Sequence, residues 1–212
     1  MQNATDLIHD ADRVVTANDG IFGTSGSPVN VLIWQLNGKN DGTGGADHAS
    51  CDYAAGANIE VCASIGASNR VSALFEAELS ECSMGGNLCG VSTGETLSRW
   101  CSAVIGNNAL PDFVSAPTWA QDGMPNWVDQ TKQSDQDYDS IGCGMAFLSW
   151  LMHRGNYSLS SIARAMVSLT ASGTLAQLYA GLSGDAAGNA WPTFSTAVNA
   201  LPNDVVNDDP FG

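Results

Sequence analysis

Apolar residues recur with helical spacing through most of the chain, and strand-like runs are confined to its first third. Residues 5–16 carry Ile8, Ala11 and Val15 on one face, which predicts a short amphipathic helix. The same spacing, with capping residues before it or glycines after it, predicts further helices at 71–82, 92–105, 140–153, 160–171, 174–182 and 192–200. Helices are therefore expected to dominate the fold.

Two segments have the composition of β-strands. Residues 29–36 are rich in Val, Leu, Ile and Trp and are bounded by Pro28 and Asn37-Gly38, so they predict a buried strand and not a solvated edge. A second strand is expected at 58–63. The polar, glycine-rich segment 37–50 between them is expected to be a long loop, and such loops are usually functional or mobile.

These elements predict a mainly helical α+β domain, in which a short N-terminal sheet is followed by a helical bundle. A chain of 212 residues fits one domain, with a strand-containing part (1–66), a helical part (67–201) and a tail (202–212). Residues 109–139, rich in Pro, Asp and Trp, are expected to be an irregular connector. The Gly/Pro/Asp-rich tail should fray unless something docks it, which favours self-association.

The charge balance restricts the partners. The chain has 22 acidic residues against 7 basic ones, a formal net charge of -15. Nucleic acids and anionic membranes both need a basic surface, so neither is expected as a partner. The longest apolar run, 141–152, is shorter than the roughly 20 residues that span a bilayer, so no membrane insertion is expected. Residues 1–6 have no basic or apolar region of a signal peptide.

Six cysteines lie at positions 51, 62, 82, 89, 101 and 143. Their even number, without Cys-x-x-Cys spacing, favours disulfides formed in an oxidising compartment, and hence an extracellular or cell-surface protein. Short loops favour Cys51 with Cys62 and Cys82 with Cys89, which leaves Cys101 and Cys143; Cys82 and Cys101 could pair instead. The alternative is that some cysteines are buried free thiols.

Glu78 is the strongest candidate for a catalytic or metal-binding residue. At about 100° per residue it projects from the middle of an apolar helix face that carries Val71, Leu74, Phe75, Leu79 and Cys82. A carboxylate there must be paired, protonated or bound to a metal, because burying a lone charge is expensive. One interpretation is a structural ion pair with Arg99 or Arg70, and the other is a functional site. Glu76 should point the opposite way, into solvent, and Glu81 lies at the edge of the face.

Three further sets of residues are candidates. Asp135, Asp137 and Asp139 alternate like the oxygen ligands of a calcium loop, although a helix cap explains them as well. His48 follows Asp47 in the long loop, where a lone histidine is usually exposed. Ser92 and Glu95 match a helix capping box. Nucleophile elbows, P-loops and dinucleotide fingerprints are absent from the sequence.

The segments Ala77-Glu-Leu-Ser-Glu81 and Gly94-Glu-Thr-Leu-Ser98, on successive helices after a strand, resemble the core of thermolysin-type zincin metallopeptidases. The resemblance implies that Glu78 matches the catalytic base and Glu95 the third zinc ligand, while Ala77 and Glu81 occupy the histidine positions. Because two ligands are missing, conventional zinc proteolysis is not expected. The segment 140–151 also resembles a stretch in uncharacterised secreted bacterial proteins with the same helix order.

The leading prediction is an extracellular, non-catalytic binding or assembly protein, zincin-like in outline, whose metallopeptidase-like core is degenerate. Its partner would be a second copy or an extracellular polymer. The alternative is a secreted hydrolase with Glu78 as general base and with Glu81 and His48 around an unconventional metal site. A third interpretation is a calcium-dependent carbohydrate-binding module that uses exposed Trp119 and Trp127.

Overall fold

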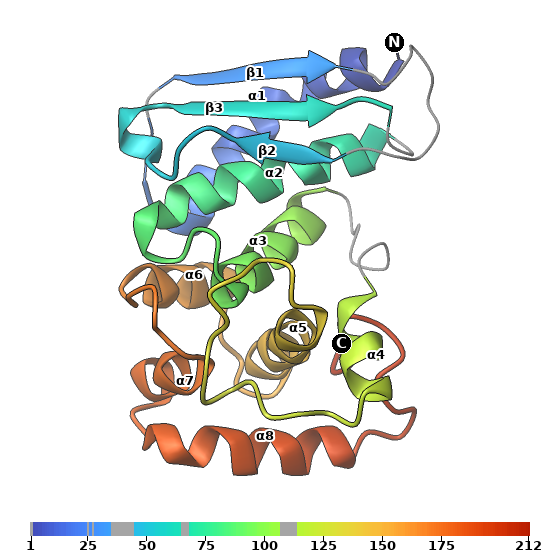
Figure 1. Ribbon diagram of the computed structural model, residues 1–212, viewed down its shortest axis with the longest axis vertical. Coiled ribbons are helices and arrows are strands. Elements are labelled where there is room, and N and C mark those ends of the chain that lie inside the picture. The colour runs from blue at the N-terminus through green and yellow to red at the C-terminus, as the bar shows by residue number, and fades with distance from the viewer. Residues whose placement is uncertain (1, 25, 27, 35–44, 65–67, 107–113) are drawn as a thin grey trace.

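The computed structural model describes residues 2–24, 26, 28–34, 45–64, 68–106 and 114–212. In this part of the chain a small sheet with two helices against it precedes a set of six further helices (Figure 1). The mainly helical α+β class and the order of sheet and helices are therefore confirmed. The zincin-like outline stays a prediction.

The sheet has the order β1-β3-β2. β1 (Val29–Trp34) runs parallel to β3 (Ala57–Cys62), and β2 (Ala46–His48) pairs with β3 in the antiparallel sense. The strand predicted at 58–63 is confirmed, but β2 lies in what was expected to be a loop; residues 37–44 of that loop are outside the described residues. The expectation that β1 is a buried interior strand is wrong. It pairs with β3 alone among the described residues, and Leu32 on its outer face is 57% exposed.

Two helices cover the inner face of the sheet. α1 (Gln2–Phe22) and α2 (Ser68–Met84) pack together there, as Figure 1 shows. The first helix is longer than the predicted 5–16, and it presents a different face to the core: Ile8 is 66% exposed. The core beneath the sheet is formed by apolar side chains from both helices and β3, among them Leu7, Val14, Ile59, Val61, Val71, Phe75 and Leu79.

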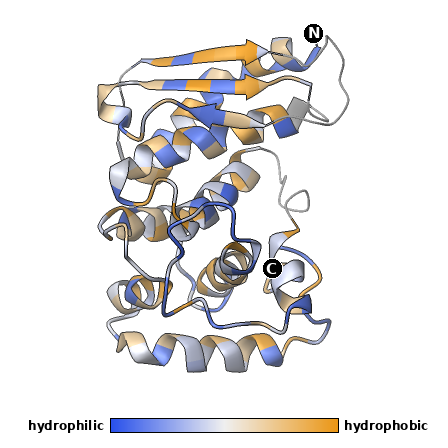
Figure 2. Ribbon diagram, viewed as in Figure 1, coloured by the Kyte–Doolittle hydropathy of each residue, from blue (hydrophilic) through white to orange (hydrophobic). Residues whose placement is uncertain are grey.

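The second core surrounds α5 (Tyr138–His153), whose residues 140–151 are all buried. Around it lie the other helices of the second part, α3 (Ser92–Ile105), α4 (Ser115–Gln121), α6 (Leu159–Val167), α7 (Leu175–Ser183) and α8 (Ala190–Asn199) (Figure 1). α4 corrects the prediction of an irregular connector over 109–139, because Ala116 and Trp119 bury an apolar face; residues 107–113 are not among the described ones. The stretch that follows α4 is largely hydrophilic (Figure 2).

Close helix contacts around α5 depend on glycine. A Cβ atom at Gly142 would lie 2.2 Å from the Ser115 carbonyl oxygen, and one at Gly144 would lie 2.3 Å from Thr96 Oγ1. Both distances are far below van der Waals contact, so the absent side chains allow α4 and α3 to approach α5. None of the helices in the described residues is long and apolar enough to cross a membrane.

The C-terminal tail is docked on its own chain. Asp208, fully buried, accepts a hydrogen bond from the backbone N–H of Ala116, and Asp209 accepts one from the Ser149 hydroxyl (2.6 Å). The Phe211 ring lies 6.4 Å from that of Phe194. The expectation that the tail frays without a second molecule is wrong, and the observation that favoured self-association is removed with it.

One disulfide, Cys51–Cys89, joins the segment after β2 to the loop after α2. The predicted pairings Cys51–Cys62 and Cys82–Cys89 are wrong, because folding brings these two loops together over a separation of 38 residues. Cys82, Cys101 and Cys143 are buried thiols, so the expected pairing of Cys101 with Cys143, or of Cys82 with Cys101, is also wrong. Buried thiols pack like small apolar side chains.

Candidate functional site

Four side chains predicted as candidates lie together between the sheet and α3. Glu78 and Glu81 are three residues apart on α2 and therefore share one side of the helix. His48, at the end of β2, places Nδ1 2.7 Å from Glu78 Oε2 and Nε2 3.9 Å from Glu81 Oε2. Glu95, in the first turn of α3, interacts with Glu81.

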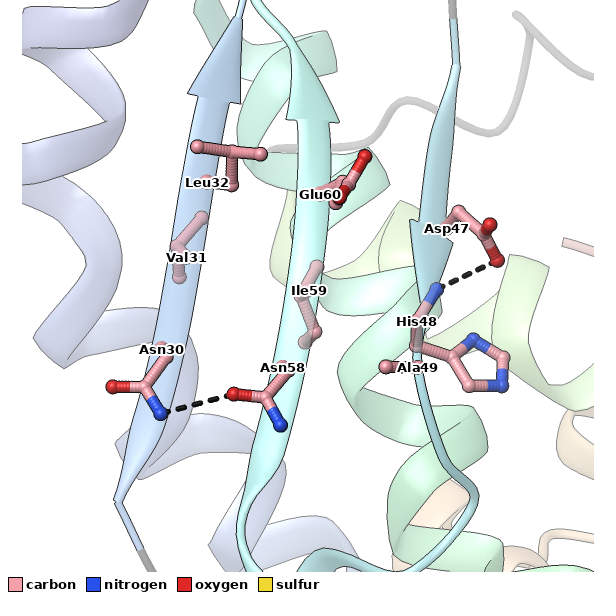
Figure 3. A pocket seen from close by; sticks show the side chains of 9 residues that line it. All are labelled: Asn30, Val31, Leu32, Asp47, His48, Ala49, Asn58, Ile59 and Glu60. Atoms are coloured by element: carbon pink, nitrogen blue, oxygen red, sulfur yellow. Dashed lines mark hydrogen bonds between the residues drawn. The ribbon is translucent and has the colours of Figure 1, made fainter.

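The strand β2 aims His48 at the helices. The Asp47 carboxylate stays close by, because its ligand atom, that of His48 and that of Glu78 lie within 4.8 Å of one another. The Asp47 carboxylate accepts a hydrogen bond from the backbone N–H of His48 at 2.8 Å (Figure 3). The expectation of an exposed loop histidine is wrong, since only 11% of the His48 side chain is exposed.

The imidazole and Glu78 form a tight pair. The hydrogen bond to Glu78 raises the pKa of His48 above its ordinary value, and the Glu78 charge adds to this effect. Burial raises the pKa of Glu78, although the hydrogen bond from His48 opposes the change. The predicted arginine partner of Glu78 is wrong: Arg99 Nε instead donates to Glu95 Oε1 at 2.6 Å. Glu78 is therefore both paired and a stronger base than an ordinary glutamate.

Glu81 holds its proton more strongly than an ordinary glutamic acid does. Burial is the largest cause, followed by the charge of Glu95 and a hydrogen bond with it, and together they raise the pKa of Glu81 to about 9. A hydrogen bond between two carboxyl groups also requires a proton between them. Since Arg99 pairs with Glu95, the proton is assigned to Glu81. The ion pair of Glu95 with Arg99 corrects the prediction that Glu95 caps the helix. The N-cap residue of α3 is Val91, and it makes no side-chain hydrogen bond to the helix.

The second ring nitrogen of His48 faces sulfur. Nε2 lies 3.1 Å from Cys89 Sγ and 3.4 Å from Cys51 Sγ. Sequence reasoning named both cysteines but missed this contact, because their pairing depends on how two distant loops meet. Within the described part of the chain, the groups of side chains close enough to hold a metal are His48 with Cys51 and Cys89, and His48 with Asp47 and Glu78.

Solvent reaches the cluster. The side chains of His48, Glu78, Glu81 and Glu95 remain 8% to 18% exposed. A hollow of about 290 Å³ lies on the sheet, lined by side chains that include Asn30, Asn58 and Glu60 (Figure 3). Its lining includes His48 but neither Glu78 nor Glu81, so the hollow adjoins the carboxylate cluster at the histidine.

Glu76 is buried, which contradicts the expectation of a solvent-facing residue. Its side of α2 is covered by α1, and the residue is 0% exposed. Burial raises its pKa well above the ordinary value, with only a partial opposing effect from the charge of Arg13. Neither carboxylate oxygen has a hydrogen-bond partner among the described residues.

Asp135, Asp137 and Asp139, predicted as calcium ligands, are not among the groups of described side chains that lie close enough to hold a metal. Asp137 caps α5 by accepting a hydrogen bond from the Ser140 backbone N–H (2.9 Å), and Asp135 accepts one from the Gln136 amide (3.1 Å). Burial, with the nearby Asp122 charge, raises the pKa of Asp139. This arrangement fits the helix cap better than a cation loop.

The two tryptophans predicted to form an exposed binding surface are buried or partly buried. Trp119 is fully buried and donates to the Pro125 carbonyl oxygen at 2.9 Å, so its predicted exposure is wrong. Trp127 is partly buried, and the Lys132 ammonium lies 4.8 Å from its ring centre. The carbohydrate-binding interpretation loses the two residues that suggested it.

Comparison of the chain with protein-family models, with curated proteins and with solved structures found no match. The function must therefore be inferred from the chemistry of the cluster itself.

Proposed function

We propose that the protein is a secreted hydrolase in which Glu78 is the general base and Glu81 the general acid. The observation that carries this proposal is the position of the two carboxyl groups. They lie on the same side of α2, one bound by His48 and the other sharing a proton with Glu95, in a site that solvent can enter. General acid–base hydrolysis needs such a pair of groups in opposite protonation states.

In this mechanism Glu78 removes a proton from a water molecule as the water oxygen attacks the scissile bond. His48 orients the Glu78 carboxylate through the 2.7 Å hydrogen bond. Glu81 gives its proton to the leaving group as that bond breaks. The Glu81 carboxylate is then reprotonated from solvent, while Glu78 releases its proton, and the ion pair of Glu95 with Arg99 stays in place (2.6 Å).

The remaining features support this function better than non-catalytic assembly. The tail is docked internally, so it supplies no argument for a second copy. Partly buried carboxylates that repel one another tend to persist at functional sites, where stability is sacrificed for activity. The Cys51–Cys89 bridge supports an oxidising, extracellular setting.

The test is turnover of p-nitrophenyl acetate, p-nitrophenyl glycosides and fluorescein-labelled casein by the wild type and three variants. Loss of one acid–base group typically lowers the rate about 10²–10⁴-fold, so we expect that loss for Glu78→Gln and for Glu81→Gln. Glu60→Gln, on the exposed side of β3, is the matched control and should retain full activity. Unchanged turnover in both site variants, or no turnover of any probe by wild type, would reject the hydrolase and favour the non-catalytic binding protein.

A further inference from the structure

The side chains around Nε2 of His48 are of the types that bind zinc. The ligand atoms of His48, Cys51 and Cys89 lie within 4.8 Å of one another. Glu81 Oε2 approaches the same ring nitrogen at 3.9 Å. These four side chains come from β2, the segment after it, α2 and the loop after α2, so the fold gathers them from separate elements.

The spacing suits tetrahedral coordination. Zinc binds sulfur at about 2.3 Å and imidazole nitrogen at about 2.0 Å, so neighbouring ligands stand roughly 3.3–3.8 Å apart. His48 Nε2 already lies 3.1 Å and 3.4 Å from the two sulfur atoms. On coordination the two sulfur atoms, now bonded to each other, would have to separate, and Glu81 Oε2 would have to approach Nε2 from its present 3.9 Å.

The orientation of the imidazole is already set. Nδ1 is hydrogen-bonded to Glu78 Oε2 at 2.7 Å, which leaves Nε2 to coordinate a metal. A carboxylate on the outer nitrogen is the usual support for a zinc-bound histidine, because it fixes the ring and raises its basicity.

We infer that reduction of the Cys51–Cys89 bridge creates a zinc site formed by Cys51, Cys89 and His48, with Glu81 as the fourth ligand. The reductant is a small thiol such as glutathione: two thiol molecules are oxidised to one disulfide, and the bridge takes two electrons and two protons to become two cysteine thiols. Zinc then displaces the two thiol protons and the Glu81 carboxyl proton, three protons in all, and changes no oxidation state. The inference concerns binding and does not depend on the proposed hydrolysis.

The bridge is accessible to such a reductant. Cys51 and Cys89 are partly exposed, and Asn87 and Gly90 beside Cys89 are exposed. Cys82, Cys101 and Cys143 are already thiols, so the reductant leaves them unchanged. The disulfide and the zinc site are therefore alternative states of the same two sulfur atoms.

The experiment measures zinc bound to the full chain before and after reduction with a phosphine, which is removed without air. We expect one zinc per reduced chain and none per oxidised chain, by native mass spectrometry. Bound zinc should also protect Cys51 and Cys89 from alkylation, a readout that needs no variant. Cobalt in place of zinc should show sulfur-to-metal charge-transfer absorption.

Variants identify the ligands. Cys51→Ser and His48→Asn should each abolish stoichiometric zinc binding, and Glu78→Gln should weaken it about 10–100-fold through loss of the outer hydrogen bond. Cys82→Ser is the matched control, because Cys82 binds the Ser50 carbonyl oxygen (3.1 Å) away from His48, and it should bind zinc like the wild type. A reduced, folded protein that binds no zinc, or that leaves both cysteines equally reactive with zinc present, overturns the inference.

Discussion

Replacement of Glu76 by methionine should stabilise the protein at neutral pH. Glu76 is 0% exposed, and neither of its carboxylate oxygens has a hydrogen-bond partner among the described residues. Methionine is similar in length and carries no polar oxygen, so it fills the same space between α1 and α2. This follows from the burial of Glu76, which the sequence predicted to point into solvent.

The expected gain follows from the missing partners. An unsatisfied buried polar group costs about 1–3 kcal/mol, and replacing buried charged groups by apolar ones often stabilises a protein by about 1–4 kcal/mol. We expect Glu76→Met to gain about 1–3 kcal/mol at pH 7, which is roughly 2–12 °C in Tm for a chain of this size. Glu76→Gln should gain less, because the amide is also left without partners.

The gain should depend on pH with a defined sign. Burial raises the Glu76 pKa in the folded state above its ordinary value of 4.5, so above pH 4.5 the unfolded chain loses this proton more readily. Wild-type stability therefore falls as the pH rises from 4.5 through the raised pKa. Both variants lack this loss, so their advantage over wild type should be small at pH 4 and should grow toward neutral pH.

Urea unfolding of wild type and both variants between pH 4 and pH 8 measures this difference. Glu60→Gln, on the exposed side of β3, is the control and should stay within about 0.5 kcal/mol of wild type. If Glu76→Met is less stable than wild type at every pH, or if its gain does not change with pH, the account of Glu76 as an unpartnered buried acid is refuted.

Three other changes have expected outcomes that unfolding and peptide mapping can check. Gly144→Ala should destabilise the protein by about 1–3 kcal/mol, because its Cβ would lie 2.3 Å from a threonine hydroxyl of α3. Gly181→Ala in α7 has open space around it and should stabilise the protein by about 0.5–1 kcal/mol. Equal effects of the two changes would contradict the packing argument. Asp208→Ala should cost about 1–3 kcal/mol, since it leaves the backbone N–H of residue 116 buried without an acceptor, and a neutral result would mean that the tail is not docked. Non-reducing peptide mapping should find Cys51 bonded to Cys89, and a bridge from Cys51 to any other cysteine would show that this pairing is wrong. Reduction of the bridge should lower the free energy of unfolding by about 4 kcal/mol, as expected for a loop of 38 residues.

Local patterns predicted the helices other than α4 and placed the two carboxyl groups of the cluster on one helix. Helical spacing alone puts Glu78 and Glu81 on the same side of α2, and Gly184, which has a positive φ of 74°, ends α7 as the pattern indicated. The run of Val, Leu and Ile at 29–34 likewise predicted β1. These features depend on residues a few positions apart, so the sequence determines them without knowledge of the rest of the chain.

Which side of each element is covered was decided only by the tertiary structure. α1 covers the side of α2 that carries Glu76, and the periodicity of α2 contains no information about that neighbour. His48 became the partner of Glu78 because β2 joins the sheet next to α2, and Cys51 became the partner of Cys89 because the loops beyond those two elements meet. Contacts between residues 30 or more positions apart depend on how whole elements pack, and hydrophobic burial, which drives that packing, has no preferred direction along the chain.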